Sequence, residues 1–487
     1  MDNNTNVIYI FSNTKYKEFI NLNKKKIILI LENKDQVEIT KKNDNNIIYY
    51  KRNDEYNSYI SCLIDLHKKV NLINFNIIID LQYNNWINTV IKYMFKYNNF
   101  YKENKKDFIF YYKNTSLPYI KSGYSERGHQ LVKNYNKNIE NREIIIITRP
   151  NFPKKSKIII EEYDRVKYIR LNQIDSILGL DYLIKIFNPK ILQVVTPPNN
   201  LIDVISFFKR KKIKCIYEIR GSWDLSCKIN NKIKKKEEYV TKYLSNENIV
   251  CRNVDKIIPI TRQIQKKVMK LTKITDMNKY FILPNCFEVS KIKKENINYN
   301  INYKKQLGLD NNFIIGYFGS IVKYEGINWL CKAIEILSKT ITNIKFLLIS
   351  KELPDEYKKY NFIIFQPYVD NNILYKYYKL LDLYIIPRLS YEVCEVVSPI
   401  KPFEPLGLKV PLLLSSVEPL LDISENEKNC YIFKKNDLFD LIYKIKDIYY
   451  NGYKKEILEN GYNYVINKRN WKLYVNKLDE VYCNLLK

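Results

Sequence analysis

The sequence predicts an α/β protein with two Rossmann-like parallel-sheet domains that face a cleft, preceded by a small α/β extension. Three observations support this fold class. Short apolar runs rich in β-branched residues alternate with longer amphipathic stretches, which is typical of parallel sheets covered by helices on both faces. The runs form two series, separated by a polar segment rich in Asn and Lys at 291–312. The 487 residues suffice for about three domains.

The expected strands are the short apolar runs of each series. The first series contains "IIIIT" (144–148), "ILQVVT" (191–196), "CIYEI" (215–219) and "KIIPIT" (256–261). The second contains "FIIGYFGS" (313–320), "KFLLIS" (345–350), "LYIIP" (383–387) and "PLLLSS" (411–416). Amphipathic segments between them are expected helices, for example "INWLCKAIEILSKTI" (327–341).

These patterns divide the chain into five segments. We expect an extension of unknown role at 1–105, a first Rossmann-like domain at 106–288, a linker with a short helix at 289–312, a second Rossmann-like domain at 313–465, and a C-terminal helix at 466–487 that packs back on the first domain. In the extension, "VIYIFS", "KIILILE", "NIIYY" and "NIIIDLQ" predict strands, and residues 56–69 predict a helix.

The composition restricts the function only weakly. The chain has 43 Tyr and 11 Gly, and Lys, Asn, Ile and Tyr, which all have AT-rich codons, dominate it together. The net charge of +29 is compatible with nucleic acid, an anionic membrane surface or phosphorylated substrates as partners. Because the lysines are scattered along the chain, the charge alone selects none of these, and we expect no nucleic-acid partner.

Cysteine and histidine usage argues against metal and triad sites. The nine cysteines include no CxxC pair, which indicates neither a zinc site nor a disulfide framework and suits a reducing compartment. Of the two histidines, His67 and His129, only His129 is expected near the cleft, which cannot build a usual zinc set, and nothing in the sequence supports a Ser-His-Asp site. The N-terminus has no signal pattern, and no apolar run approaches the roughly 18 residues that cross a bilayer. We therefore expect a cytoplasmic protein, with peripheral contact to a membrane surface as an open possibility.

The segment "IIGYFGSIVKYEGINWL" (314–330) is a candidate phosphate-binding loop. A buried strand ends at Gly319 and Ser320, a short loop follows, and Gly326 precedes a helix. Small residues at such a turn let backbone N–H groups approach a phosphate, and the helix N-terminus adds partial positive charge. A plain tight turn between strand and helix has the same pattern, so this segment alone does not distinguish a phosphate-binding loop from a structural turn.

The segment "DLYIIPRLSYEVCEVVSPIKPFEPLGLKVPLLLSS" (382–416) favours the phosphate-binding interpretation. Arg388 follows one strand, and Lys401 and Glu404 precede the next, with Glu404 on an expected short helix. The two cations suit a diphosphate, and the carboxylate suits vicinal sugar hydroxyls. In an open α/β sheet, ligands bind outside the carboxyl ends of the strands, where both segments fall.

These two segments resemble the donor-site signature of the retaining, family 4 type glycosyltransferases with the GT-B fold. More narrowly, they resemble bacterial polysaccharide and glycolipid transferases whose motif is Glu-x-x-(Thr/Ser)-Pro-x-Lys-Pro-x-Glu, here "EVVSPIKPFE" (395–404), preceded by Gly-Ser-x-x-x-Tyr-Glu-Gly, here "GSIVKYEG" (319–326). Further landmarks occur in the expected order: "SLPYIKSGYSERGHQL" (116–131), "ITRPNFP" (147–153), "YEIRGSW" (217–223) and "ILPNCFE" (282–288). The resemblance covers about residues 106–487.

The resemblance implies roles in donor binding for the second domain. Glu404 would hold the ribose of a nucleotide-sugar, and Arg388 and Lys401 would hold its diphosphate with help from the backbone at Gly319 and Ser320. Arg388, Lys401 and Glu395 are the candidate catalytic residues, Glu395 by facing the donor sugar. The broad family pairs two glutamates eight positions apart, whereas here the earlier glutamate lies one residue too early.

The resemblance also implies that the first domain binds the acceptor. Gly123 would bring its glycine loop against the diphosphate across the cleft. Glu218 and Arg220, at the end of a strand, would face the acceptor or the donor sugar. Arg127 would touch an anionic acceptor or pair with an acidic neighbour, and His129 would lie near the cleft entrance or serve a structural role.

Several positions depart from the family pattern. Where the broad family often has a lysine before the loop glycine, this chain has Glu325, so Lys323 or, better placed, Lys401 would supply the charge. Lys409 replaces a glycine expected after the second glutamate. Thr196 stands near the position where many relatives have a histidine, which leaves the sugar-contacting group open.

The predicted function is that of a hexosyltransferase-type glycosyltransferase. It would move a sugar from a nucleoside-diphosphate-sugar to a hydroxyl of a glycan, glycolipid or glycoprotein, with retention of the anomeric configuration. No Asp-x-Asp box follows a strand of the first domain, so we expect no metal and no other cofactor. Two alternatives are a nucleotide-sugar epimerase and a non-catalytic protein that binds carbohydrate or an anionic surface.

Overall fold

The structure is a computed structural model that describes most of the chain after residue 105 and four strands before it. The described residues are 6–10, 27–31, 47–51, 75–79, 106–149, 152, 160–171, 176–229, 235–289, 304–305, 307–425 and 427–487. They fall into two compact units, one drawn from 1–119 and 140–190 and the other from 120–139 and 191–487. Each unit is described by itself.

The first unit begins with a four-stranded parallel sheet. Its strands are β1 (Asn6–Ile10), β2 (Ile27–Leu31), β3 (Ile47–Lys51) and β4 (Phe75–Ile79). Their order is β3-β2-β1-β4, and every neighbouring pair is parallel. The strands predicted for the N-terminal extension are therefore confirmed. The helix predicted at 56–69 lies outside the described residues.

The described residues in the rest of the first unit form four strands and a helix. These are β5 (Asp107–Lys113), β6 (Arg142–Thr148), β7 (Ile160–Tyr163), β8 (Val166–Arg170) and α5 (Ser176–Phe187). The strand order is β5-β6-β8-β7, in which only the β7–β8 hairpin is antiparallel. Strands β5 and β6 are buried almost throughout, as expected for strands covered on both faces.

The second unit starts with elements of the predicted first domain. They are α4 (Gly123–Asn138), β9 (Ile191–Val195), α6 (Leu201–Arg210), β10 (Lys214–Ile219), α7 (Trp223–Ile229), α8 (Lys236–Asn253), β11 (Lys256–Pro259), α9 (Arg262–Thr272) and η3 (Met277–Lys279). Strands β9, β10 and β11 pair in parallel. Their carboxyl ends lie at residues 195, 219 and 259; the predicted site residue Glu218 lies near the end of β10, and Arg220 follows that strand directly.

The second unit continues with the predicted second domain and the C-terminal helices. The elements are β12 (Phe313–Phe318), η4 (Lys323–Glu325), α12 (Ile327–Leu337), β13 (Ile344–Ser350), η5 (Asp355–Tyr357), β14 (Ile363–Pro367), α13 (Asn371–Leu380), β15 (Leu383–Ile386), α14 (Glu392–Val396), α15 (Phe403–Gly407), β16 (Leu412–Ser415), α16 (Glu418–Ser424), β17 (Tyr431–Phe433), α17 (Leu438–Asn451), α18 (Lys455–Lys468) and α19 (Trp471–Leu486).

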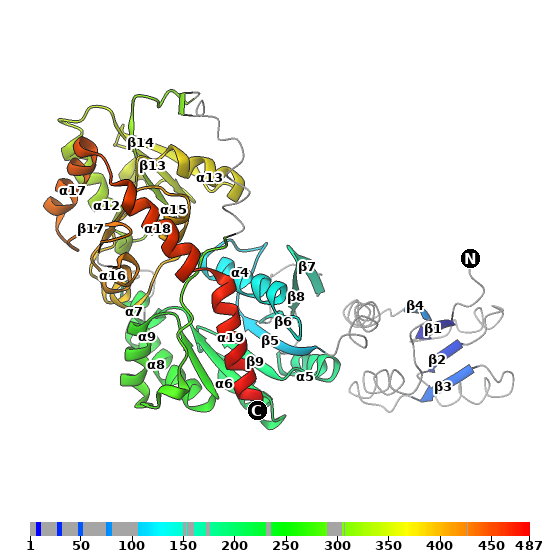
Figure 1. The fold of residues 1–487 in the computed structure, drawn as a ribbon. Helices are drawn as coiled ribbons and strands as arrows, with labels where there is room; N and C mark the ends of the chain where they lie inside the picture. The colour runs from blue at the N-terminus through cyan, green and yellow to red at the C-terminus, as the bar shows by residue number, and fades with distance from the viewer. Residues whose placement is uncertain are drawn as a thin grey trace. The chain divides into compact units, whose positions relative to one another are not determined.

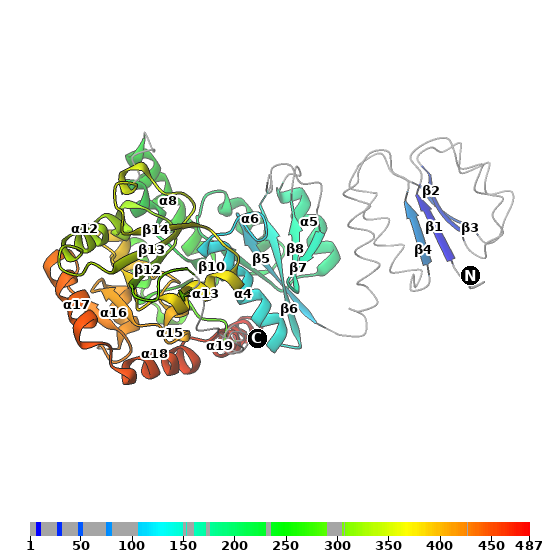
Figure 2. The same ribbon diagram turned by 90° about the horizontal axis from the view of Figure 1, so that it is seen from above.

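The six strands from β12 to β17 form a doubly wound sheet. Their order is β14-β13-β12-β15-β16-β17 and every pair is parallel. Figure 2 shows α12 and α13 on opposite sides of this sheet. Apolar side chains of α12 and α17 pack on one face, and those of α13, α15, α16 and α18 pack on the other. The strand order reverses between β12 and β15, which is where open α/β sheets bind ligands.

The C-terminal helix α19 packs against α4, beside which it lies in Figure 1. The rings of Tyr135 and Tyr482 are 5.6 Å apart, and the Tyr135 hydroxyl donates to Asp479 at 2.5 Å. The Tyr482 hydroxyl also donates to Gln193 on β9 at 2.6 Å. These contacts place α4 in the second unit, so the compact units do not follow the predicted domain boundaries, which stay a prediction.

Candidate active site

A cavity of about 570 Å³ opens in the second unit at the carboxyl ends of its strands. One wall comes from the start of α4 and the segments after β10 and β11, and the other from the segments after β12, β13, β14 and β15. Of the twelve predicted site residues, eight line it: Gly123, Arg127, Arg220, Gly319, Ser320, Arg388, Lys401 and Glu404. The structure therefore brings together the two segments that the sequence singled out.

Glycine is required at both ends of the loop between β12 and α12. Gly319 has φ +149°, and a Cβ there would lie 2.4 Å from Cε of Lys401. Gly326 has φ +77°, and its Cβ would lie 1.9 Å from the carbonyl oxygen of Pro387 at the end of β15. The missing side chains thus let the loop approach β15 and let Lys401 lie over the end of β12.

Lys401 and Arg388 meet at a buried carboxylate that belongs to Glu325. The Arg388 Nη2 donates to Oε1 of Glu325 at 2.7 Å, and the Lys401 Nζ lies 3.1 Å from Oε2. The Tyr317 hydroxyl also donates to Oε2, at 3.0 Å. We call Glu325, Arg388 and Lys401 the donor-side cluster.

The electrostatics of the donor-side cluster keep all three charges in place. Burial opposes ionisation of Glu325, but Arg388 and Lys401 outweigh it and lower its pKa from an ordinary 4.5 to about 2. Burial lowers the pKa of Lys401, and Glu325 offsets part of that effect. The Lys401 ammonium also lies 5.2 Å from the centre of the Tyr317 ring. The cluster therefore carries one net positive charge beside the cavity.

Arg388 keeps hydrogen-bonding capacity after these contacts. Its Nη1 donates to the carbonyl of Val397 at 2.8 Å, while its buried Nε has no partner among the described residues. Lys401 has a side chain that is 19% exposed, at the cavity. Lys401 can thus donate further hydrogen bonds to an anion from the cavity side, whereas the unpartnered Nε of Arg388 is buried.

Glu404 lies in the first turn of the short helix α15, as predicted, and lines the cavity. The Tyr378 hydroxyl lies 3.4 Å from its Oε2, a long and weak contact. The ring of Tyr378 packs edge-on against Phe318, with centroids 4.6 Å apart. Tyr378 and Phe318 line the cavity too, so the carboxylate stands at the border of an aromatic wall.

The start of α4 forms the opposite wall. Ser122 caps the helix by accepting from the backbone N–H of Ser125 at 3.2 Å. A Cβ on Gly123 would lie 3.4 Å from Cδ1 of Ile400, so the helix start lies against the turn that carries Lys401. Gly123 therefore has the position that the sequence predicted, across the cavity from the donor-side cluster.

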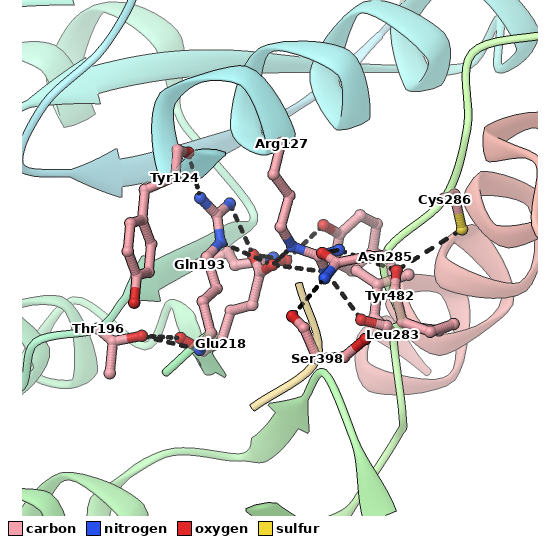
Figure 3. Close-up of polar contacts among 12 residues, drawn as sticks. Tyr124, Arg127, Gln193, Thr196, Glu218, Leu283, Asn285, Cys286, Ser398 and Tyr482 are labelled. Carbon is pink, nitrogen blue, oxygen red and sulfur yellow. Dashed lines mark hydrogen bonds and ion pairs between the residues drawn. The ribbon is translucent and has the colours of Figure 1, made fainter. Parts of the chain in front are cut away.

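Glu218 does not face the cavity, contrary to the expectation that it contacts acceptor or donor sugar. Its side chain is fully buried, and it accepts from Arg127 at 3.0 Å, from Arg220 at 2.9 Å and from Gln193 at 2.8 Å. Figure 3 shows this carboxylate among its partners. We call Glu218, Arg127 and Arg220 the acceptor-side cluster.

The two arginines of the acceptor-side cluster line the cavity but are bound by protein groups. Arg127 donates to the carbonyls of Leu283 and Pro284, each at 2.8 Å, and to Asn285 Oδ1 at 2.9 Å (Figure 3). Arg220 donates to the carbonyl of Tyr124 at 2.9 Å. Burial lowers the pKa of Arg220 to about 9. Their main visible role is to tie α4, β10 and the 283–285 segment together.

Comparison with known proteins finds a family match over the part of the chain that contains the donor-side cluster. Residues 312–451 match the sequence profile of a family described as "Glycosyl transferases group 1". Over these residues the chain is similar to that family. The chain is also 25% identical to the capsular polysaccharide biosynthesis glycosyltransferase CapM of Staphylococcus aureus, over 331 residues that make up 65% of this chain and 82% of the relative.

Solved structures confirm the fold class. Sucrose-phosphate synthase from Thermosynechococcus elongatus matches with a TM-score of 0.59 at 14% identity, over 78% of this chain and 99% of that one. HepE of Anabaena, in complex with UDP-glucose, matches with a TM-score of 0.58 at 11% identity, over 77% and 99%. The fold is thus α/β with two parallel-sheet domains, of the GT-B type. The family and CapM together support glycosyltransferase activity.

Two site residues predicted in the second Rossmann-like domain lie outside the cavity lining. Glu395 accepts from Ser390 at 2.7 Å, from Lys435 at 2.8 Å and from the backbone N–H of Glu418 at 3.1 Å. Partial burial opposes its ionisation, but these bonds hold its pKa below the ordinary value. Lys323 is exposed on η4. The structure therefore favours Lys401 over Lys323 as the cation of the donor site, and does not bring Glu395 to the cavity wall.

The other departures from the family pattern have local explanations. Lys409 adopts φ +56°, the conformation in which glycine is favoured, and its Nζ pairs with Glu459 at 2.6 Å. Thr196 bonds the backbone of β10: its hydroxyl accepts from the N–H of Arg220 at 2.9 Å. His129 is buried in α4, away from the cavity lining, which suits its structural alternative.

The sequence interpretation missed the cavity's aromatic wall and Asn285. Tyr368 and Tyr378 line the cavity, and the Tyr368 hydroxyl lies 3.2 Å from Oγ of Ser320. Asn285 also lines it and donates to the carbonyl of Ser398 at 2.9 Å, next to the turn with Lys401. With 43 Tyr in the chain, composition alone gave no signal for the two tyrosines.

No group of three or more His, Cys, Asp or Glu side chains with a metal-binding arrangement occurs among the described residues. Across the same part of the chain, no helix is both long enough and apolar enough to span a membrane.

Proposed function

We propose that this protein is a retaining glycosyltransferase that moves a sugar from a nucleoside-diphosphate-sugar to an acceptor hydroxyl. The observation that carries the proposal is the convergence of Arg388, Lys401, Gly319 and Glu404 on one cavity at the switch point of a doubly wound sheet. The donor's diphosphate would lie against the two cations and the backbone at Gly319 and Ser320. Glu404 would accept hydrogen bonds from the ribose hydroxyls.

The reaction requires stabilisation of negative charge on the leaving diphosphate. The bond between the anomeric carbon and the diphosphate oxygen breaks as positive charge develops on the sugar. Arg388 and Lys401 would stabilise this charge, and because their contacts with Glu325 hold them beside the cavity, little reorganisation would be needed. These side chains would serve in place of a metal ion.

Retention follows from attack on the face that the diphosphate leaves. The acceptor hydroxyl would approach beside the departing phosphate, form the new bond to the anomeric carbon and give its proton to a phosphate oxygen. No enzyme carboxylate needs to form a covalent intermediate. Glu395 would face the sugar only after a change in the bonds that hold it to Lys435 and Ser390.

The acceptor would be a glycan or a lipid-linked glycan. The likeness to a capsular polysaccharide biosynthesis enzyme supports this class, and UDP-sugars are reasonable first donors, since the Anabaena structure contains UDP-glucose. A cytoplasmic location, at the membrane surface if the acceptor is lipid-linked, belongs to the same proposal.

A donor panel tests the proposal. We expect one nucleotide-sugar to be consumed in the presence of an oligosaccharide acceptor, with the anomeric configuration of the product, read by NMR, equal to that of the donor. Lys401→Ala and Glu404→Ala should each abolish turnover while circular dichroism stays unchanged. Normal turnover in either variant would reject the site, and isomerisation of the donor without an acceptor would support an epimerase instead.

A further inference from the structure

Glu325 lies behind the two donor-side cations and does not line the cavity. It is 3% exposed, and its two carboxylate oxygens are divided between the cations: Oε1 accepts from Arg388 and Oε2 contacts Lys401. The Tyr317 hydroxyl fixes Oε2 from a third direction at 3.0 Å. A ligand in the cavity would therefore contact the cations and not the carboxylate that holds them.

The three charged residues come from three separate segments of the chain. Glu325 ends η4, Arg388 follows β15, and Lys401 precedes α15. The backbone at Gly319 and Gly326 lets these segments approach, and Arg388 and Lys401 themselves lie outside the strands and helices that flank them. Among the described residues, the Glu325 carboxylate is the group that contacts both cations.

The charge of Glu325 also limits how strongly the cations attract an anion. Two adjacent cations without a counter-ion repel each other and bind a diphosphate tightly before and after reaction. With Glu325 ionised, the cluster keeps one net positive charge, and the low pKa of Glu325 means that this holds throughout the neutral range.

We infer that Glu325 is a positioning residue: it holds the Arg388 guanidinium and the Lys401 ammonium in the geometry that the leaving diphosphate requires, and it reduces their ground-state attraction for that diphosphate. This rests on the proposed function, because it assigns the diphosphate to those two cations. The position where the wider family often has a lysine carries instead the acid that orients a lysine from another segment.

The inference separates binding from turnover. Without the carboxylate, the two cations remain beside the cavity and still attract a diphosphate, so ground-state binding is retained or strengthened. Their fixed arrangement is lost, however, so the additional stabilisation of the transition state decreases. A residue that merely supported the fold would lose both properties together.

Glu325→Gln tests this, because glutamine keeps the size of the side chain and removes its charge. We expect kcat with the identified donor to fall about tenfold or more, while the Kd of inorganic pyrophosphate, measured by calorimetry, is equal to or smaller than that of the wild type. A kcat equal to the wild-type value, or a parallel loss of turnover and pyrophosphate binding, would overturn the inference.

Two further variants keep the test decisive. Glu325→Asp retains the charge but is one methylene too short to reach both cations, so it should fold, bind pyrophosphate normally and show a reduced kcat; a wild-type kcat would count against bridging. Glu459→Gln is the matched control, because it also removes a negative charge beside a lysine, in the exposed pair with Lys409, and should change neither quantity.

The outcomes also separate this inference from the proposed function. If Lys401→Ala keeps full turnover, the donor site itself is misassigned. If Lys401→Ala is inactive and Glu325→Gln is fully active, the donor site stands and only the positioning role fails.

Discussion

The donor-side and acceptor-side clusters each consist of one buried glutamate between two cations, but they differ in the other contacts that the cations make. In the acceptor-side cluster, Arg127 makes three further bonds to Leu283, Pro284 and Asn285, so its guanidinium is saturated by protein. In the donor-side cluster, the Nε of Arg388 has no partner among the described residues, and the Lys401 side chain stays partly exposed.

This difference separates architecture from ligand binding. Buried charges must be paired and hydrogen-bonded, so a saturated cluster is fully explained by the fold that it supports. In the donor-side cluster, Lys401 keeps a partly exposed ammonium at the cavity lining. The donor-side cluster is therefore the better candidate for binding an anion, whereas the contacts of Arg127 are explained by holding α4 against β10.

The largest expected effect on turnover comes from Lys401→Ala. Removing one preorganised cation from a developing phosphate charge should lower kcat/KM for the donor by about 100- to 1000-fold. The free energy of unfolding should fall as well, because the change leaves the buried Glu325 carboxylate with one cationic partner fewer. Steady-state kinetics and urea unfolding of the same preparation check both, and Lys409→Ala, which removes an exposed lysine of the same domain, serves as the control.

The largest expected effect on stability comes from the acceptor-side cluster. Arg127→Met leaves the buried Glu218 carboxylate short of a partner and frees two backbone carbonyls, so the free energy of unfolding should fall by about 3–5 kcal/mol. Urea unfolding measures it. If Arg127 instead serves mainly to bind an acceptor, the variant would keep its stability and show a raised KM for the acceptor.

Much of the site could be predicted because it depends on where strands end. Parallel strands bring their carboxyl ends to one edge, so the residues after β12 and β15 were expected together, and Gly319, Arg388 and Lys401 do line one cavity. All eight strands predicted in the two series are present. The short strands β14 and β17 carried too weak a pattern to be recognised in advance.

What sequence could not supply was the identity of long-range partners. Glu218 follows the pattern of a cleft residue, but an arginine 91 positions earlier buries it. At position 325 the broad family often has a lysine, so Glu325 suggested that the site lacks a positive charge. In the structure, Glu325 pairs with Arg388, which lies 63 positions later in the chain, and so belongs to the cation site. A buried charge is explained only by the groups around it, and spacing along the chain does not reveal them.

The pH dependence of stability should distinguish two buried glutamates with opposite shifts. The pKa of Glu325 is lowered to about 2, so its contribution is present above about 4.5 and is lost as the pH falls from 4.5 toward 2. The pKa of Glu247 is raised to about 7, chiefly by burial, so its contribution is present below about 4.5 and is lost as the pH rises from 4.5 to 7.

Urea unfolding between pH 3 and pH 8 measures these slopes. Relative to the wild type, Glu247→Gln should remove a decline in stability between pH 4.5 and pH 7, and Glu325→Gln should remove a decline below pH 4.5. Identical pH profiles for the wild type and both variants would mean that neither carboxyl has a shifted pKa in the folded protein.

The smallest expected effects compare two tyrosine hydroxyls, one in each region. The Tyr378 hydroxyl makes a long contact to Glu404 at the cavity, whereas the Tyr482 hydroxyl donates at 2.6 Å to Gln193, which contacts Glu218 of the acceptor-side cluster. Tyr378→Phe keeps the packing on Phe318 and should change the donor KM by about threefold or less without loss of stability. Tyr482→Phe should leave that KM unchanged and lower the free energy of unfolding by about 1 kcal/mol, because it leaves a buried amide oxygen with one donor fewer. Steady-state kinetics and urea unfolding of both variants test this comparison. If Tyr482→Phe changes the donor KM and Tyr378→Phe lowers the stability, the acceptor-side cluster is the one that contacts the donor, and the roles assigned to the two clusters are wrong.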